Sequence, residues 1–299
     1  MALPRWFPLA RKEAVALLKS KGTWILAPLL VVWGYGPTYI SWDLLGPDVT
    51  VGFVQVAGSI LLPLCVLLLT YRSIIQERTS GSLKFLLGLP LTRTDILIGK
   101  VVGRSVGAVL PFALSAVVLG VIGGVKFGLF SPLRFIGVFL VTVLYIAVLV
   151  SIATAASAVT TSTVRVTAVL FGGFFLLLTL GWKIVGVRLY SAVTGNAVNP
   201  LSPPADGLLF AILRFSPGRA YRTVTNWILG LANSGGQYTS VATVLYPGHS
   251  VNEYVVDAAF SGQPVPAYLH ESIALVVLLL WGVIPLALAR YRFNRGDLA

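Results

Sequence analysis

The sequence predicts an all-α polytopic membrane protein that forms a single membrane domain over residues 1–299. Of its 299 residues, 57% are hydrophobic and only 11% are charged, whereas an average soluble domain is about 25% charged. Too little polar surface remains to cover a water-soluble globule, and so apolar a chain is not expected to be disordered. Six apolar stretches also approach the roughly 20 residues that a helix needs to cross a bilayer.

Each of these stretches is expected to form one membrane-spanning helix, in which Gly and Pro are tolerated because neighbouring helices satisfy the backbone. The spans are expected at Thr23–Ser41, Val51–Tyr71, Ile96–Val121, Phe135–Val159, Val164–Val187 and Ser272–Ala289. No carboxylate lies inside a span, which argues against proton-driven transport and against a Na⁺ site built on acidic ligands. Lys100 and Arg104 lie near the inner end of the third span, where both side chains are expected to snorkel.

Residues 1–22 are predicted to form an amphipathic entry helix on the membrane surface. In the string "LARKEAVALLKSK" the apolar residues gather on one side and the basic residues surround them, a pattern typical of interfacial helices. The basic region is too long for the start of a cleavable signal peptide, and no A-x-A site follows it. A plain cationic topology signal remains an alternative.

The distribution of Lys and Arg predicts the orientation of the chain. With the N-terminus inside, fifteen Lys and Arg residues fall on the inner side and seven on the outer side. Because positive residues favour the inner side, we expect a multi-pass protein of the cell membrane with both termini cytoplasmic. The net charge of +12 is then explained by this bias and by anionic lipid, without nucleic acid as a partner.

The outside segment over residues 188–271 is too long to lack secondary structure in a compact domain. Its string "GLLFAILRF" is apolar but too short to span, and apolar residues from Tyr221 to Leu231 recur at helical spacing. We expect short interfacial or re-entrant helices there. Arg214, Arg219 and Arg222 are expected to face anionic lipid head groups or an accessory protein outside.

Several chemistries have no support in the sequence. The string nearest to a phosphate-binding loop has Val101 after Gly99-Lys100 and Thr94 in place of the first glycine. Cys65 is the only cysteine and there are two histidines, which leaves little for a metal site. We therefore expect no catalytic residue, no metal and no cofactor in this chain.

The cytoplasmic loop over residues 72–95 carries the sharpest signal. Gly81 permits a sharp turn, and "SLKFLLG" then predicts a short helix with Leu83, Leu86 and Leu87 on one face. Thr92 and Asp95 have the spacing of a capping box that starts the third span. An exposed apolar helix needs a partner, and docking into a groove of a cytoplasmic protein is the natural reading. A helix that lies on lipid is the alternative.

The string "ERTSGSLKFLLGLPLTR" resembles the first cytoplasmic loop of ABC transporter permeases of the type-2 export class. Within that class it most resembles the subgroup that includes the permease of nitrous-oxide-reductase maturation. The string "LIGKVVGR" after it and "ARKE" in the entry helix are similar to further parts of that family. The layout of entry helix, six spans and large outside segment before the last span also matches.

This resemblance implies an ATP-driven exporter in which two permease chains pair, as a homodimer or a heterodimer. A separate ATPase subunit would bind ATP and Mg²⁺ and would push a coupling helix around Ser82–Leu87. The implied ATPase-coupling residues are Glu77, Arg78, Gly81, Ser82, Leu83, Lys84, Leu86 and Leu87. The entry helix would contribute Arg11, Lys12 and Glu13. For Glu77 and Arg78, ordinary snorkelling charges at a helix end are the alternative.

Two other functions stay open. A membrane-embedded lipid-modifying enzyme needs a cluster of His, Asp or Glu at a membrane surface, and the outside acidic residues form no familiar motif. A non-transporting sensor or scaffold that partners an ATPase complex needs no site of its own. The transported substrate cannot be inferred from these residues.

Overall fold

The computed structural model describes residues 4–36, 39–82, 88, 90–249 and 251–295. Its regular elements in this part of the chain are helices, with two isolated bridges between loop residues. In chain order they are α1 (Phe7–Lys19), α2 (Lys21–Gly34), α3 (Tyr39–Leu45), η1 (Gly46–Asp48), α4 (Val49–Ser59), α5 (Leu61–Thr70), α6 (Ile75–Thr79), α8 (Arg93–Phe127), α9 (Pro132–Val159), α10 (Thr163–Thr167), η2 (Ala168–Leu180), α11 (Trp182–Thr194), α12 (Gly207–Arg214), α13 (Pro217–Leu229), α14 (Tyr238–Leu245), α15 (Val256–Ala259), η3 (Ala267–Leu269) and α16 (Glu271–Arg295).

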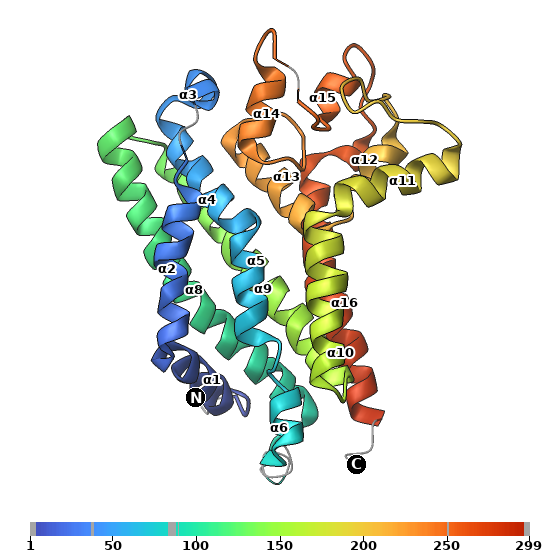
Figure 1. Ribbon diagram of the computed structural model, residues 1–299. Coiled ribbons are helices and arrows are strands. Elements are labelled where there is room, and N and C mark those ends of the chain that lie inside the picture. The colour runs from blue at the N-terminus through green and yellow to red at the C-terminus, as the bar shows by residue number, and fades with distance from the viewer. Residues whose placement is uncertain (1–3, 37–38, 83–87, 89, 250, 296–299) are drawn as a thin grey trace.

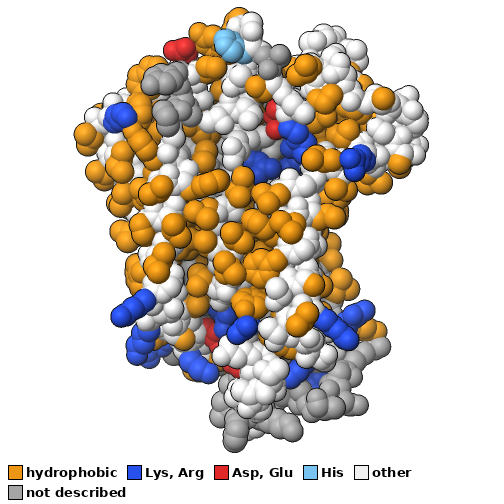
Figure 2. Space-filling view, viewed as in Figure 1, with side chains coloured by type: hydrophobic (Ala, Val, Ile, Leu, Met, Phe, Trp, Pro, Cys, Tyr) orange, Lys and Arg blue, Asp and Glu red, His pale blue; other side chains and the backbone are white. Residues whose placement is uncertain are grey.

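The long helices form one bundle with two distinct ends (Figure 1). The end that holds α1, α6 and the last turns of α16 is called the basal end here, and it lies at the bottom of Figure 1. The opposite end, which holds α3 and α11–α15, is called the distal end. In Figure 2, hydrophobic side chains cover the middle of the visible face, and Lys and Arg gather toward the two ends. This is the distribution expected of a protein in a bilayer.

The described helices support four to six membrane spans. By length and composition, the helical segments Arg93–Phe127, Pro132–Val159, Thr163–Leu180 and Glu271–Arg292 can each cross a membrane. Two bent pairs add one span each if each pair is counted as a single span. The polytopic all-α class is thereby confirmed, while the number six stays a prediction.

The predicted start of the third span is confirmed. The Thr92 hydroxyl accepts a hydrogen bond from the Asp95 N–H, and the Asp95 carboxylate accepts one from the Thr92 N–H. This capping box satisfies backbone donors at the start of α8. The helix then runs 35 residues to Phe127, which is longer than the predicted span because the apolar pattern continues beyond Val121.

The second span is not one continuous helix as predicted. It divides into α4 and α5 at Ile60, and the two halves are bent by 41°. Pro63 explains the position, because proline lacks an N–H and its ring clashes with the carbonyl group four residues earlier, at Ser59. In the first turn of a new helix the missing donor costs nothing. The break therefore lies just before that turn.

The first and fifth spans end earlier than predicted. The helix α2 ends at Gly34, before the Tyr35-Gly36 pair, and α1 is bent by 67° from it. The fifth span is a short α-helix followed by the π-helix η2, which ends at Leu180. After Gly181 the chain turns into α11, where the Trp182 indole donates a hydrogen bond of 2.8 Å to the Ile212 carbonyl oxygen of α12.

The chain between Trp182 and Leu269 contains the short helices α11–α15 and η3, while their place outside the membrane stays a prediction. Buried apolar residues between Tyr190 and Leu269 pack into a second hydrophobic cluster, to which α11, α12 and α15 contribute. The helix α13 is different, since it is buried from Pro217 to Asn226 although half of those residues are polar. It packs against α4, α9 and α16, so it is part of the bundle rather than a surface helix.

Candidate functional site

A buried ion-pair network at the basal end joins the entry helix to the loop over residues 72–95. The Lys100 Nζ of α8 lies 2.9 Å from Glu13 Oε1 of α1 and 2.8 Å from Glu77 Oε1 of α6. The Arg104 Nε, one turn further along α8, lies 2.8 Å from Glu13 Oε2. Four charges from three helices therefore meet at one place.

Burial makes this network energetically important. Lys100 is fully buried and the Glu13 side chain is 7% exposed. Burial of the Glu13 carboxyl raises its pKa, but the charges of Lys100 and Arg104 outweigh this effect and hold the pKa below its ordinary value. Glu13 is therefore ionised at neutral pH. The second carboxylate oxygen of Glu77, Oε2, is buried and has no hydrogen-bond partner in the described part of the chain.

Three glycines on one face of α8 bring α1 close enough for these contacts. A Cβ on Gly103 would lie 2.3 Å from the Ala10 carbonyl oxygen, and one on Gly99 would lie 3.0 Å from the Trp6 carbonyl oxygen. A Cβ on Gly107, one turn beyond, would lie 2.9 Å from the Leu17 Cβ. The backbone of α1 thus approaches α8 directly at Gly99 and Gly103, and the Leu17 side chain packs on Gly107.

The start of the loop is also attached to the end of α9. The Arg78 guanidinium donates hydrogen bonds to the carbonyl oxygens of Thr160 and Ala158. The Ser157 hydroxyl accepts hydrogen bonds from the N–H groups of Ile74 and Ile75. Residues that lie more than 80 positions apart in the sequence are therefore joined at the point where the chain leaves α5.

Two predictions about charged residues are wrong. Lys100 does not snorkel, because it is fully buried between two carboxylates, and Arg104 pairs with Glu13 and donates to the Leu69 carbonyl oxygen. Glu77 pairs with Lys100, and Arg78 donates to the carbonyl oxygens of Thr160 and Ala158. Contacts of these two residues with an ATPase subunit stay a prediction.

The other predicted coupling residues are placed only in part. Gly81 has φ +75°, which confirms the expected turn, and the Ser82 hydroxyl lies 2.9 Å from that of Ser80. In α1, Arg11 and Lys12 are exposed, whereas Glu13 is buried. The predicted positions Leu83, Lys84, Leu86 and Leu87, and so the proposed coupling helix itself, lie outside the described residues.

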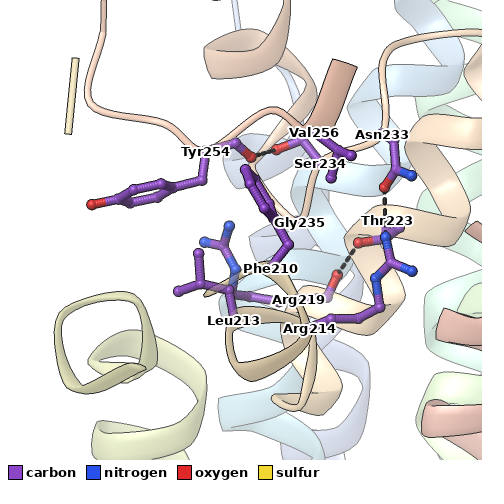
Figure 3. A pocket seen from close by; sticks show the side chains of 10 residues that line it. All are labelled: Phe210, Leu213, Arg214, Arg219, Thr223, Asn233, Ser234, Gly235, Tyr254 and Val256. Carbon is purple, nitrogen blue, oxygen red and sulfur yellow. Dashed lines mark hydrogen bonds between the residues drawn. The ribbon is translucent and has the colours of Figure 1, made fainter. Parts of the chain in front are cut away.

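A second polar core lies at the distal end, and it overturns the expectation that three arginines face lipid. Arg214, Arg219 and Arg222 are each less than one-tenth exposed. Arg214 donates to the Asn233 side-chain oxygen and to the His270 carbonyl oxygen. Figure 3 shows Arg214, Arg219, Asn233 and Ser234 around a small cavity. These arginines hold loops together rather than meeting a surface.

Glu253 provides the negative charge of this distal core. Its carboxylate lies 2.9 Å from the Arg219 Nη2 and 3.6 Å from the Lys183 Nζ. Burial raises the pKa of Glu253, but the charges of Arg219 and Lys183 and the hydrogen bonds from Arg219 and the Tyr254 N–H lower it to about 2. The loop that contains Glu253 is thereby fixed to α11 and α13.

Residues of α4 attach the distal end to the bundle. The Gln55 amide nitrogen donates to the side-chain oxygens of Thr225 and Asn226, and its oxygen accepts from the Tyr238 N–H. A Cβ on Gly58 would lie 2.2 Å from the Tyr221 hydroxyl oxygen. The available signal in the sequence was a polar side chain, Gln55, inside the apolar run Val51–Tyr71.

The comparisons with known proteins agree with this architecture. Residues 7–298 match the family model described as ABC-2 family transporter protein. The chain is 32% identical over 120 residues to the "Probable ABC transporter permease protein NosY" of Pseudomonas aeruginosa, which covers 37% of this chain and 42% of that protein. It is 33% identical over 115 residues to the protein of the same name from Stutzerimonas stutzeri, with 36% and 40% covered. The chain thus matches about two fifths of the length of each of these relatives.

The family match carries the assignment, because it extends over nearly the whole chain whereas the curated relatives match only a part. The apolar helices and the match to permease proteins agree with it. The chain therefore belongs to the ABC-2 family of transporter proteins and is a multi-pass membrane subunit of an ABC transporter.

Proposed function

We propose that this subunit is part of an ATP-driven exporter and that a separate ATPase subunit docks on the loop over residues 72–95. The observation that carries the proposal is the ion-pair network around Lys100. It joins α6, at the start of this loop, to α8, which follows the loop, and to the entry helix α1. A force on the loop would therefore reach three helices at once.

Because the loop over residues 72–95 is attached to several helices, a movement of the loop is expected to move these helices with it. Removal of one partner of a buried ion pair strongly destabilises a folded protein. The pairs that join α1, α6 and α8 are therefore expected to stay formed, and these three helices to move together. The bonds from Arg78 to the end of α9 add a fourth helix to the group. Closure of ATPase subunits on ATP would then tilt these helices relative to the distal end.

The remaining parts of the proposal follow the same reasoning. ATP and Mg²⁺ would be bound by the partner, two permease chains would pair, and membrane lipid would surround the bundle. The described chain begins and ends at the basal end (Figure 1), which is compatible with both termini on the cytoplasmic side of the cell membrane. The distal end would then face outward, where an accessory protein is a further proposed partner.

The docking step is tested by co-expression of the chain with a candidate ATPase subunit, followed by co-purification. The double variant Leu83→Asp/Leu86→Asp is expected to insert into the membrane normally but to lose the ATPase. The matched control is Leu201→Asp, a 63% exposed leucine of the distal end, which should keep it. Retention of the ATPase by the double variant would overturn the docking proposal.

The assembled complex distinguishes the other candidate functions. An exporter is expected to couple vanadate-sensitive ATP hydrolysis to movement of a cargo across proteoliposomes. Hydrolysis without any cargo movement would favour a sensor or scaffold. Turnover of a lipid by the purified chain alone would favour a membrane-embedded enzyme.

A further inference from the structure

An open groove runs along the outside of the bundle between η2 and α16, which stand side by side at one edge in Figure 1. Both helices pack on α9, but they lie close to each other at few positions, and a space of about 630 Å³ remains between them. Ligand pockets typically have volumes of about 300–1,000 Å³. The spans Thr163–Leu180 and Glu271–Arg292 are also the least buried of the four long helical segments, at 28% and 17% against 50% for the others. The groove therefore faces the surrounding membrane.

The shape of the groove fits a hydrocarbon chain. Ala155 and Ala156 of α9 line it, and their small side chains leave room between the two flanking helices. One end is closed where Phe174 of η2 meets Trp281 of α16, with ring centroids 6.1 Å apart. The Trp281 indole donates a hydrogen bond of 2.7 Å to the Phe215 carbonyl oxygen, which holds this ring in place. The groove is thus a blind apolar slot.

The length of the groove matches one leaflet of a bilayer. It extends along α16 from Trp281 to Arg292, and eleven residues of α-helix rise about 16 Å. One leaflet contributes half of a hydrocarbon core that is about 30 Å thick. An acyl chain that ends beside Trp281 would therefore place its head group at the level of Arg292.

Arg292 is the one charged residue among the described residues that line the groove. Its side chain is exposed at the basal end, and it takes part in none of the ion pairs of the described residues. The planar guanidinium group matches two oxygen atoms of a phosphate group. Shape and charge together favour a phospholipid with a net negative charge.

A second copy of this chain would complement the groove less well. The chain carries a net charge of +12, so a second copy brings mainly positive charge toward Arg292. Among the described carboxylates of the basal end, Glu13 and Glu77 are already paired with Lys100. Asp95 is engaged in the capping box of α8. An anionic head group supplies the negative charge that these residues do not.

We propose that the groove between η2 and α16 binds one anionic phospholipid, with an acyl chain along α9 and the phosphate group on Arg292. The bound lipid fills the space between two spans that scarcely touch, and so it stabilises their separation. The proposal requires only that the chain crosses the membrane, and it does not depend on the docking of an ATPase.

The test measures lipid binding to the purified full chain in a neutral detergent by native mass spectrometry. The probes are phosphatidylglycerol and phosphatidylcholine with the same acyl chains, which differ in the net charge of the head group. The wild type should bind its first phosphatidylglycerol about fivefold more tightly than its first phosphatidylcholine, as expected for one basic residue near an anionic head group. Arg292→Gln should remove this preference. Lys19→Gln, a change at an exposed basic position of α1, should keep it.

The sharpest pair of variants is Gly173→Leu and Gly172→Leu. Of these neighbours in η2, Gly173 is among the residues that line the groove and Gly172 is not. A Cβ on either glycine would meet nothing within 4 Å, so the fold should tolerate both changes, and equal unfolding temperatures would verify this. Leucine at position 173 should occupy the groove and weaken the binding of both lipids about tenfold, whereas leucine at position 172 should have no effect.

The position of the lipid is tested with phosphatidylglycerol that carries a photoreactive diazirine in one acyl chain. Illumination should label peptides of η2 and α16 in the wild type and in Gly172→Leu, and the labelling should be lost in Gly173→Leu.

Three results would overturn the proposal. The first is equal binding of the two lipids by the wild type, and the second is equal lipid binding by Gly173→Leu and Gly172→Leu. The third is labelling that avoids η2 and α16, as expected if a second copy of the chain covers the groove. None of these results would affect the docking proposal, which co-purification of the ATPase tests separately.

Discussion

A methyl group on Gly103 of α8 would lie 2.3 Å from the carbonyl oxygen of Ala10 in α1. That separation is shorter than non-bonded atoms tolerate, so the two helix backbones touch only because position 103 has no side chain. The position of the entry helix is therefore determined by a close backbone approach as well as by ion pairs.

Gly103→Ala is expected to displace α1 and lower the unfolding temperature of the detergent-purified protein. Overpacking of this kind costs about 1–3 kcal/mol, whereas alanine in an open helix position gains about 1 kcal/mol over glycine. Trypsin cleavage at the exposed Arg11 and Lys12 should become faster. The control is Gly124→Ala on the same helix, where the heavy atom nearest to an added Cβ lies at 3.7 Å, and it should not lower the unfolding temperature. Equal unfolding temperatures of the two variants would contradict the prediction.

Lys100→Met should be among the most destabilising single changes at the basal end. It leaves Glu13 and Glu77 without their shared cation, and loss of one partner of a buried ion pair costs about 3–5 kcal/mol. Adding Glu77→Gln should recover part of the loss, because one uncompensated charge disappears. A double-mutant cycle of thermal unfolding measures this coupling, and strictly additive losses would show that the two residues do not interact.

Gln55→Leu should loosen the distal end without unfolding the bundle. The change removes hydrogen bonds to Thr225 and Asn226 and leaves the Tyr238 N–H without its acceptor. Each buried polar group left unpaired costs about 1–3 kcal/mol. Limited proteolysis between α11 and α16 should become faster, while Gln76→Leu, a change at an exposed position of α6, should leave the cleavage pattern as in the wild type.

The distal end should become sensitive to acid through Glu253. Its pKa is lowered in the folded chain from 4.5 to about 2, so it contributes stability that is fully present above its unfolded pKa. This contribution is lost as the pH falls from about 4 toward 2, because the unfolded chain takes up the proton first. Unfolding temperatures measured from pH 6 to pH 3 should fall less steeply in Glu253→Gln, which should also be less stable at pH 6. An unchanged pH profile in that variant would be inconsistent with this role.

Features that depend on neighbouring residues could be predicted from the sequence. The capping box of Thr92 and Asp95 and the turn at Gly81 are local, and both are observed. The break at Ile60 was missed although Pro63 marks it. In that case the long apolar run suggested one continuous helix, and the local effect of the proline on the backbone prevailed.

The networks could not be predicted because their partners are distant in the sequence. Glu13 and Lys100 are 87 positions apart, and Arg219 and Glu253 are 34 apart. Without knowing which helices are neighbours, a basic residue near a membrane surface is best explained by snorkelling or lipid, and that explanation is wrong for Lys100 and Arg219. The spacing of Gly99, Gly103 and Gly107 was the one available signal for close helix packing at this face.

The division of the second span at Ile60 has a mechanical consequence. Its distal half, α4, is anchored by Gln55 and Gly58 to α13 and α14, and its basal half, α5, leads into the part of the chain held by Lys100. The joint thus separates two segments with independent anchors. A change of the bend at Ile60 would therefore let α5 move with the basal end while α4 stays attached to the distal end.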